Sequence, residues 1–316
     1  MGFGVSKKTE AFSFLLKPIK AIWVIFMNTI WSTYVQGIET LYQTRLLRFS
    51  DIFKEKYQKV FLIEQRSKVL EIGCGPGALA DSLSRWYPDA QIYGIDRDSN
   101  FIGFARKKAL NVKFSEGDAM HLSFSSESFD VTISNTVAEH IEPYKFYGEQ
   151  YRVLKDDGVC IVLSVRKGIN IKAPCIREES AFEKDIRKRT ERYFAETLNK
   201  YSVCAYPQNE AELPLFMGKY GFKDVTTDYI TINLTPDDPR YSKEMAYAMI
   251  NANRKSDLES VDKLLYIAAH DVSSSDVEEL KRLVNAKYDK RLELYDKGLK
   301  QWDTNMSVIM VVRGIK

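Results

Sequence analysis

Short, mostly apolar runs recur in the first half of the chain. Residues 69–72, 91–96 and 112–114 are runs of the kind that predict strands buried on both faces of a sheet. More polar stretches, long enough for helices, separate them. Strands that alternate with helices predict an α/β fold with a doubly wound, mostly parallel sheet.

Three- and four-residue spacing of apolar side chains predicts helices elsewhere. Helices with one apolar face are predicted over residues 34–49 and 280–299. A third helix, charged and exposed, is predicted over residues 177–200. Ser275 and Glu278 have the spacing of a capping box, which predicts the start of the helix that contains residues 280–299.

The break after the first predicted strand is the most informative segment. Gly73, Gly75 and Gly77 follow that strand at once and lead into a predicted helix. Glycine lets the backbone take unusual dihedral angles and approach a ligand closely, while a helix amino end offers N–H donors and a positive dipole. The segment therefore predicts a turn that holds a small anionic ligand.

Two classes of cofactor fit this turn. Gly73, Gly75 and Ala78 satisfy the loose pattern G-x-G-x-x-G/A of dinucleotide sites. Glu71 argues for the other class, because its carboxylate would repel a pyrophosphate and would tolerate a cationic ligand.

The ends of the next two predicted strands carry acids as well. Asp96 ends the second strand and suits the two hydroxyls of a ribose, which both cofactor classes contain. Asp118 follows the third strand, where an adenine amino group could donate to it. Dinucleotide sites have less use for this second acid, so the pair favours the class with a cationic ligand.

With these residues, the chain from about 69 to 165 resembles the class I S-adenosylmethionine-dependent methyltransferases, which carry an E-x-G-x-G-x-G turn. The resemblance implies a Rossmann-like sheet of seven strands, mostly parallel, with the last strand antiparallel. It places the later strands near 129–135, 159–165, 226–234 and 306–313. The implied cofactor is S-adenosylmethionine, with S-adenosylhomocysteine as product. The cofactor-binding residues that it implies are Glu71, Gly73, Cys74, Gly75, Gly77, Asp96, Arg97, Asp118, Ala119, Met120 and Asn135.

The same resemblance suggests a division of the chain. Residues 1–50 are expected to form a helical cap, and residues 51–234 with 305–316 the cofactor-binding domain. Residues 235–304 are expected to form a helical insertion between the sixth and seventh strands. Two roles stay open for this insertion, which are capping of the substrate and contact within a homodimer.

Composition narrows the function classes. The chain has 316 residues, is 45% hydrophobic and 28% charged, and has a formal net charge of +3, which is typical of a globular protein with a large core. Without a basic run interleaved with aromatics, nucleic acid is not expected as a partner. The four cysteines are widely separated, so neither disulfides nor a metal site is predicted, and a cytoplasmic location fits.

Residues 12–31 are apolar and aromatic enough to raise the question of a membrane. Lys17, Pro18, Lys20 and Asn28 interrupt the segment, which leaves its apolar run well short of the roughly 20 residues that a bilayer crossing needs. Two interpretations remain: a helix that closes over the mouth of the active site, and peripheral membrane contact through residues 12–31.

Methyl transfer from a sulfonium is an in-line displacement, so the protein mainly aligns the reactants and excludes water. A base is needed only for a protonated acceptor, and Glu139 or His140, just after the fourth predicted strand, lies in the right place. For His140 a role in shaping the cofactor site is the alternative. Tyr34, Tyr42 and Arg45 are predicted substrate contacts on the cap.

The predicted function is transfer of a methyl group from S-adenosylmethionine to a small organic acceptor. The aromatic-rich ends of the chain favour a covered, partly apolar pocket for it. Three alternatives stay open: an NAD-dependent oxidoreductase, a non-catalytic interaction protein, and a methyltransferase that acts on a membrane-associated lipid or an isoprenoid-type molecule.

Overall fold

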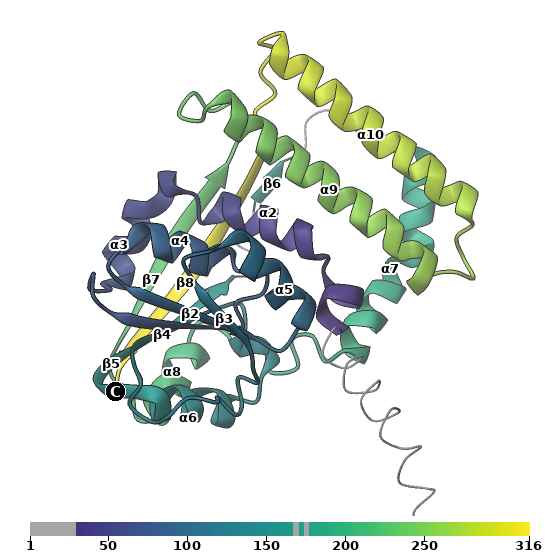
Figure 1. Ribbon diagram of the computed structural model, residues 1–316. Coiled ribbons are helices and arrows are strands. Elements are labelled where there is room, and N and C mark those ends of the chain that lie inside the picture. The colour runs from purple at the N-terminus through teal and green to yellow at the C-terminus, as the bar shows by residue number, and fades with distance from the viewer. Residues whose placement is uncertain (1–29, 167–170, 174–176) are drawn as a thin grey trace, which may run out of the picture.

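The computed structural model describes residues 30–166, 171–173 and 177–316, and the strands in these ranges form one sheet (Figure 1). The strands are β1 (Lys68–Ile72), β2 (Gln91–Asp96), β3 (Lys113–Glu116), β4 (Phe129–Asn135), β5 (Leu154–Val165), β6 (Ile171–Ala173), β7 (Lys223–Leu234) and β8 (Thr304–Ile315). Their order is β3-β2-β1-β4-β5-β8-β6, and β7 also pairs with β8.

The order and directions of the strands confirm the predicted fold class. β1 to β5 run parallel to one another, and β8 runs antiparallel to β5 and β7. The short strand β6, which also pairs antiparallel with β8, is an addition that the sequence did not predict.

The helices follow the strands in sequence as a doubly wound fold requires. They are η1 (Trp31–Val35), α2 (Ile38–Arg48), η2 (Asp51–Phe53), α3 (Lys54–Phe61), α4 (Ala78–Trp86), α5 (Ser99–Lys108), η3 (Ala138–His140), α6 (Pro143–Val153), α7 (Ala181–Lys200), α8 (Glu212–Lys219), α9 (Lys243–Ile267) and α10 (Ser274–Asp296). None of the helices in the described ranges has the length and apolar character to cross a bilayer.

Each face of the sheet is covered by its own set of helices. Strand β8 shows the division, because successive side chains of a strand point to opposite faces. Ile309 and Val311 belong to the core beneath α3, α4 and α5, whereas Met310 and Val312 belong to the core beneath α6 and α8. These strands therefore carry apolar side chains on both faces, as expected for a sheet that helices cover on both sides.

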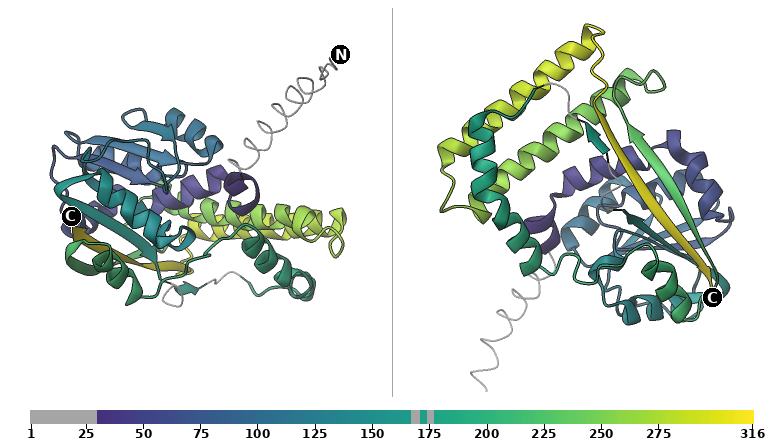
Figure 2. Two further views of the ribbon diagram at one scale, coloured as in Figure 1. Left: turned by 90° about the horizontal axis from the view of Figure 1, so that it is seen from below. Right: turned by 180° about the vertical axis from the view of Figure 1, so that it is seen from behind.

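A third apolar core lies outside the sheet, among α7, α9 and α10. Ile186, Ile250, Leu264 and Val284 are members of this cluster. Figure 2 shows α9 and α10 side by side, extending beyond the edge of the sheet. We call the unit of α7, α9 and α10 the helical arm.

The arm joins the sheet through a buried group of charges. Arg291 of α10 is fully buried and donates to Asp237 at 2.7 Å and to Asp303 at 2.8 Å. Asp237 follows β7 and Asp303 precedes β8. The three charges therefore hold α10 at both ends of the segment between β7 and β8, to which α10 belongs. Loss of one partner would leave a buried charge without its counterion, which typically costs about 3–5 kcal/mol.

The start of α10 differs from the prediction. Its capping box consists of Ser273 and Asp276, not Ser275 and Glu278, so the predicted box was wrong by two residues. Ser273, Ser274 and Ser275 are all good N-cap residues, and the helix begins at the first of them that has an acid three positions later. The divisions at residues 50, 234 and 305 stay predictions.

Candidate active site

The glycine turn between β1 and α4 has the strained backbone that the sequence predicts. Gly73 and Gly77 have φ angles of +67° and +86°, which favour glycine. A Cβ atom at Gly73 would lie 2.5 Å from Cγ2 of Val137, and one at Gly77 would lie 2.8 Å from Cζ of Phe114. Any larger residue would therefore clash with the loop after β4 or with β3.

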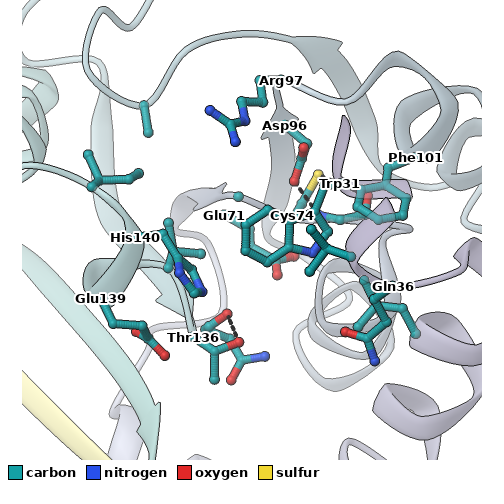
Figure 3. A pocket seen from close by; sticks show the side chains of 18 of the residues that line it. Trp31, Gln36, Glu71, Cys74, Asp96, Arg97, Phe101, Thr136, Glu139 and His140 are labelled. Atoms are coloured by element: carbon teal, nitrogen blue, oxygen red, sulfur yellow. Dashed lines mark hydrogen bonds between the residues drawn. The ribbon is translucent and has the colours of Figure 1, made fainter. Parts of the chain in front are cut away.

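A cavity of about 640 Å³ lies over this turn, at the carboxyl ends of the parallel strands (Figure 3). Ligands of open α/β sheets bind in this position, and the volume is typical of a small-molecule site. The residues that β1 to β4 and their following loops contribute include Glu71, Gly73, Cys74, Gly75, Asp96, Arg97, Asp118, Ala119, Met120 and Asn135.

Two acids in this cavity, the buried Glu71 and the partly buried Asp96, have raised pKa values. Burial, opposed by the N–H groups of Asp98 and Gly75, raises the pKa of Asp96 to about 6. Asp96 accepts these N–H groups at 2.9 and 2.8 Å. Burial raises the pKa of Glu71 well above its usual range, and Oε2 of Glu71 has no hydrogen-bond partner among the described residues. Such groups gain from a ligand that donates hydrogen bonds or carries positive charge.

Asp118 lies at the far end of the cavity, after β3. Its Oδ1 accepts the N–H of Met120 at 2.9 Å, and it forms an isolated antiparallel bridge with His121. This local turn fixes the position of the carboxylate beyond the end of the strand.

The short helix η1 forms another wall of the cavity. Trp31 and Gln36 line the cavity, and the Trp31 ring meets the His140 ring edge-on, with centroids 4.7 Å apart. Ser32 donates to both carboxylate oxygens of Asp98, from its N–H at 2.8 Å and from its hydroxyl at 3.0 Å. We call residues 31–37 the strap.

The helical arm holds the other end of the strap. Glu259 of α9 accepts the N–H of Gly37 at 2.7 Å, and Lys263 of α9 donates to the carbonyl of Val35 at 2.8 Å. The strap is thus fixed between α5, which follows β2, and the helical arm.

The loop after α7 closes the cavity beside η3. The N–H of Cys204 donates to Nδ1 of His140 at 2.8 Å, and the N–H of Tyr206 donates to the Glu139 carbonyl at 3.0 Å. Because Nδ1 accepts a hydrogen bond, a neutral His140 ring carries its proton on Nε2. This arrangement suits a positioning role for His140 better than proton removal.

The cavity brings together most of the residues that the sequence singled out. The ten strand-end residues named above lie around it, as do Glu139, His140 and Arg45. Gly77 shapes the turn but is not part of the lining. Tyr34 stacks on Tyr201 and Tyr42 packs against Phe104, so neither predicted substrate contact lies in the cavity wall.

Other lining residues were missed. They come from the strap, from the last turn of α7 and from the loop after it, and they are Trp31, Val35, Gln36, Leu198, Val203, Cys204 and Tyr206. Residues 12–31 form an apolar segment that ends at Trp31, but no spacing pattern in the sequence links Trp31 to residues 198–206. The rest of that segment, apart from Ile30, lies outside the described residues.

Comparison with known proteins agrees with this geometry. Residues 70–162 match the family described as methyltransferase domain, and this range runs from β1 to β5 and contains the glycine turn and both strand-end acids. Residues 70–162 form a methyltransferase domain.

Two curated relatives of this methyltransferase domain show how far the similarity reaches. The demethylmenaquinone methyltransferase of Thermus thermophilus is 34% identical over 126 residues, which is 38% of this chain and 57% of that protein. The fatty-acid O-methyltransferase of Mycolicibacterium smegmatis is 33% identical over 108 residues, 33% of this chain and 39% of that protein. The chain thus matches about two fifths to just over half of these relatives.

A solved structure shares the fold over a longer range. The phosphoethanolamine N-methyltransferase 2 of Haemonchus contortus, solved with S-adenosylhomocysteine, aligns with a TM-score of 0.50 and 17% identity. The alignment covers 91% of this chain and 60% of that chain. At this identity, the likeness concerns the fold of the methyltransferase domain and not its substrate.

Proposed function

We propose that this protein transfers a methyl group from S-adenosylmethionine to a small organic acceptor. The observation that carries the proposal is one cavity that holds the glycine turn and the acids of three neighbouring strand ends, Glu71, Asp96 and Asp118. Dinucleotide oxidation, the alternative from the sequence, is disfavoured by Glu71 and by the matched family.

The residues present fit the cofactor. Oε2 of Glu71, buried and without a hydrogen-bond partner in the described ranges, is an acceptor that awaits a donor. Asp118 would hold the adenine, Asp96 the ribose, and the glycine turn and Asn135 the part of the cofactor beyond the ribose. The bound cofactor supplies an electrophilic methyl group on a sulfonium. The chain's own part is to orient this group, to exclude water and to position the acceptor.

The acceptor side of the cavity favours an apolar molecule. Its wall includes Trp31, Leu41, Phe49, Val137, Ile141 and Val203. Leu198 and Tyr206 also line the cavity, yet 43% and 40% of their surfaces are exposed. Apolar side chains therefore continue from the cavity to the protein surface.

This continuity supports a second candidate, in which the acceptor is an amphiphile whose apolar part extends past Leu198 and Tyr206. The two relatives, a fatty-acid O-methyltransferase and a demethylmenaquinone methyltransferase, agree in name with such an acceptor. Membrane contact through residues 12–31, homodimer formation and a cytoplasmic location stay predictions.

For acceptors that lose a proton, Glu139 remains the candidate base. It lies in the cavity wall next to His140, whose Nδ1 is already engaged by Cys204. A carboxylate needs only to be near the acceptor's proton to assist its removal.

Calorimetric titration with S-adenosylmethionine, S-adenosylhomocysteine and NAD in parallel tests the proposal. We expect micromolar binding of the first two and no heat from NAD. Binding of NAD alone, or of none of them, would refute it. A panel of carboxylic acids and phenols with short and long alkyl chains, assayed with methyl-labelled cofactor, then separates the two acceptor candidates, because an amphiphile site turns over the long-chain members faster.

A further inference from the structure

Gln36 brings a carboxamide to the part of the cavity wall that the strap forms. Three residues of the strap line the cavity, Trp31, Val35 and Gln36. Figure 3 shows the Gln36 side chain pointing into the cavity, across from Glu139 and His140. A carboxamide has two N–H donors and one C=O acceptor, and within the described part of the chain this side chain makes no hydrogen bond. Its polar groups are therefore available to a ligand in the cavity.

The helical arm holds the backbone on both sides of Gln36. The carbonyl of Val35 accepts from Lys263 at 2.8 Å, and the N–H of Gly37 donates to Glu259 at 2.7 Å. These two groups belong to the two peptide units that flank the Cα atom of Gln36. Because both units are held, the direction in which the Gln36 side chain leaves the backbone is fixed.

Glu259 and Lys263 hold the strap as a pair. They lie one turn apart on α9 and form a salt bridge at 2.7 Å. Burial would raise the pKa of Glu259, but hydrogen bonds from Lys263, from Thr40 of α2 and from the strap outweigh burial and lower it. Glu259 is therefore ionised at neutral pH, where hydrogen bonds to a charged group are stronger than those between neutral groups.

Gly37 permits the close approach of Glu259. A Cβ atom at residue 37 would lie 2.6 Å from Oε2 of Glu259, so a larger residue would displace the carboxylate that holds the strap. Gly37 is also the N-cap of α2, and a negative charge at the amino end of a helix stabilises it. Glu259 thus supports both the strap and the helix whose Leu41 and Arg45 line the cavity.

The location of Gln36 favours the acceptor over the cofactor as its ligand. The acids of the strand ends are matched to the polar groups of the cofactor, whereas the strap belongs to the wall where Leu198 and Tyr206 lead to the protein surface. We propose that the Gln36 carboxamide hydrogen-bonds the polar head of an amphiphilic acceptor, and that Glu259 is a positioning residue that acts through the strap. This inference rests on the proposed function and names the side chain that selects the acceptor.

Binding of the acceptor can be measured apart from methyl transfer, by calorimetry on protein saturated with S-adenosylhomocysteine. The probes are dodecanoate and para-dodecylphenol, which share an apolar chain and differ in the polar head. Gln36→Met keeps the length of the side chain and removes its hydrogen bonds. We expect it to weaken the better-bound probe about three- to tenfold, the range for one hydrogen bond, and to leave the affinity for S-adenosylhomocysteine within about twofold.

The role of Glu259 is tested through its coupling to Gln36. Glu259→Ala should weaken the same probe by a similar factor, and the double variant with Gln36→Met should lose little more than Gln36→Met alone. Glu259→Gln keeps an oxygen that can accept the N–H of Gly37 and should restore most of the affinity. Lys255→Met is the matched control, because Lys255 lies one turn earlier on α9 and pairs with Glu39 of α2 rather than with the strap. It should change neither affinity by more than about twofold.

Each part of the inference can fail separately. An unchanged affinity for both probes in Gln36→Met would overturn the assignment of Gln36, and an equal loss of S-adenosylhomocysteine would show that Gln36 supports the fold or the cofactor instead. Additive losses in the double variant would show that Glu259 does not act through Gln36. Wild-type protein that binds S-adenosylhomocysteine but neither probe would refute the amphiphilic acceptor. Wild-type protein that does not bind S-adenosylhomocysteine would refute the proposed function itself.

Discussion

Two walls of the same cavity are built in different ways. One wall consists of strand ends and the turns that follow them, where Gly73, Asp96 and Asp118 are fixed by the sheet. Another wall consists of the strap and the loop after α7, where Trp31 and Val203, far apart in the sequence, both line the cavity. The sheet wall presents acids, and the helical wall presents apolar side chains. The difference suggests that the first wall holds the cofactor and the second selects the acceptor.

The largest effect is expected from the sheet wall. Replacement of Asp96 by Ala removes the acceptor for the ribose hydroxyls, and we expect S-adenosylhomocysteine binding to weaken by about 1.5–3 kcal/mol, the range for hydrogen bonds to a charged group. Calorimetry measures this loss. Asp96→Asn, which keeps one acceptor oxygen, should lose less, and an unchanged affinity in Asp96→Ala would remove Asp96 from the cofactor site.

The pH dependence of cofactor binding tests the same wall. Since burial raises the pKa of Asp96 to about 6, the carboxylate that accepts the ribose hydroxyls is lost as the pH falls through 6. We expect affinity to fall by up to about tenfold per pH unit below 6, and Glu71, whose pKa is raised by burial, acts in the same direction.

The unliganded protein should respond in the opposite sense. The pKa of Asp96 in the folded protein lies above 3.8, the value for the unfolded chain. Protonation of this carboxyl therefore stabilises the folded state, and the stabilisation is fully present below pH 3.8. This stabilisation is lost as the pH rises through 6. Stabilisation by S-adenosylhomocysteine in thermal melts should therefore be larger at pH 7.5 than at pH 5. A flat affinity profile between these values would contradict the assignment.

The helical wall should affect the acceptor more than the cofactor. Trp31→Ala removes a large apolar surface and its contact with His140, worth about 0.5–1.5 kcal/mol for the aromatic pair alone. We expect kcat/KM for an apolar acceptor to fall about three- to tenfold, with a smaller change in S-adenosylhomocysteine affinity. Trp31→Phe is the control that keeps an aromatic ring. Equal losses in kcat/KM and in S-adenosylhomocysteine affinity would show that the two walls do not have separate roles.

A smaller effect is expected at Ser32, which links the strap to the sheet wall through its hydrogen bonds to Asp98. Ser32→Ala removes the hydroxyl bond to Asp98 and leaves the backbone N–H bond in place. The loss of about 0.5–1.5 kcal/mol should raise the dissociation rate of S-adenosylhomocysteine a few-fold in stopped-flow experiments. Thermal stability should change little, and an unchanged dissociation rate would mean that the strap does not restrain the ligand.

The smallest effect is expected at Tyr42, a predicted substrate contact that the structure places outside the cavity lining. Its ring packs against Phe104 of α5, and Tyr42→Phe keeps this contact. We expect cofactor affinity and kcat/KM to stay within about twofold of wild type. A larger loss in kcat/KM would restore Tyr42 to the acceptor site.

The sheet wall could be predicted because its signals are local. The glycine turn follows a buried strand at once, and each acid stands at the end of its own apolar run, so position in the sequence defines position in the site. The sixth and seventh strands were predicted from the family resemblance, and they are β7, which Gly221 at φ +99° precedes, and β8.

The helical wall gave no such signal. Trp31 and Cys204 are 173 residues apart in the chain, and both meet His140 because the helical arm carries α7 past η1. Arg45 could be named as a site residue, but its hydrogen bond to Thr136 depends on how α2 packs over the turn. Such contacts have no periodicity that a single sequence reveals.

The two ends of the segment between β7 and β8 meet at a single point. The hydroxyls of Thr235 and Thr304 are 2.7 Å apart, and Arg291 binds the acids next to both of them. Residues 236–303 are therefore inserted at one junction between two strands that pair directly with each other. The insertion reaches well beyond that junction, because Met249 and Ala252 of α9 join the core beneath the sheet and Glu259 and Lys263 of α9 hold the strap. A change of sequence confined to this insertion would therefore alter the strap without touching the glycine turn or the strand-end acids.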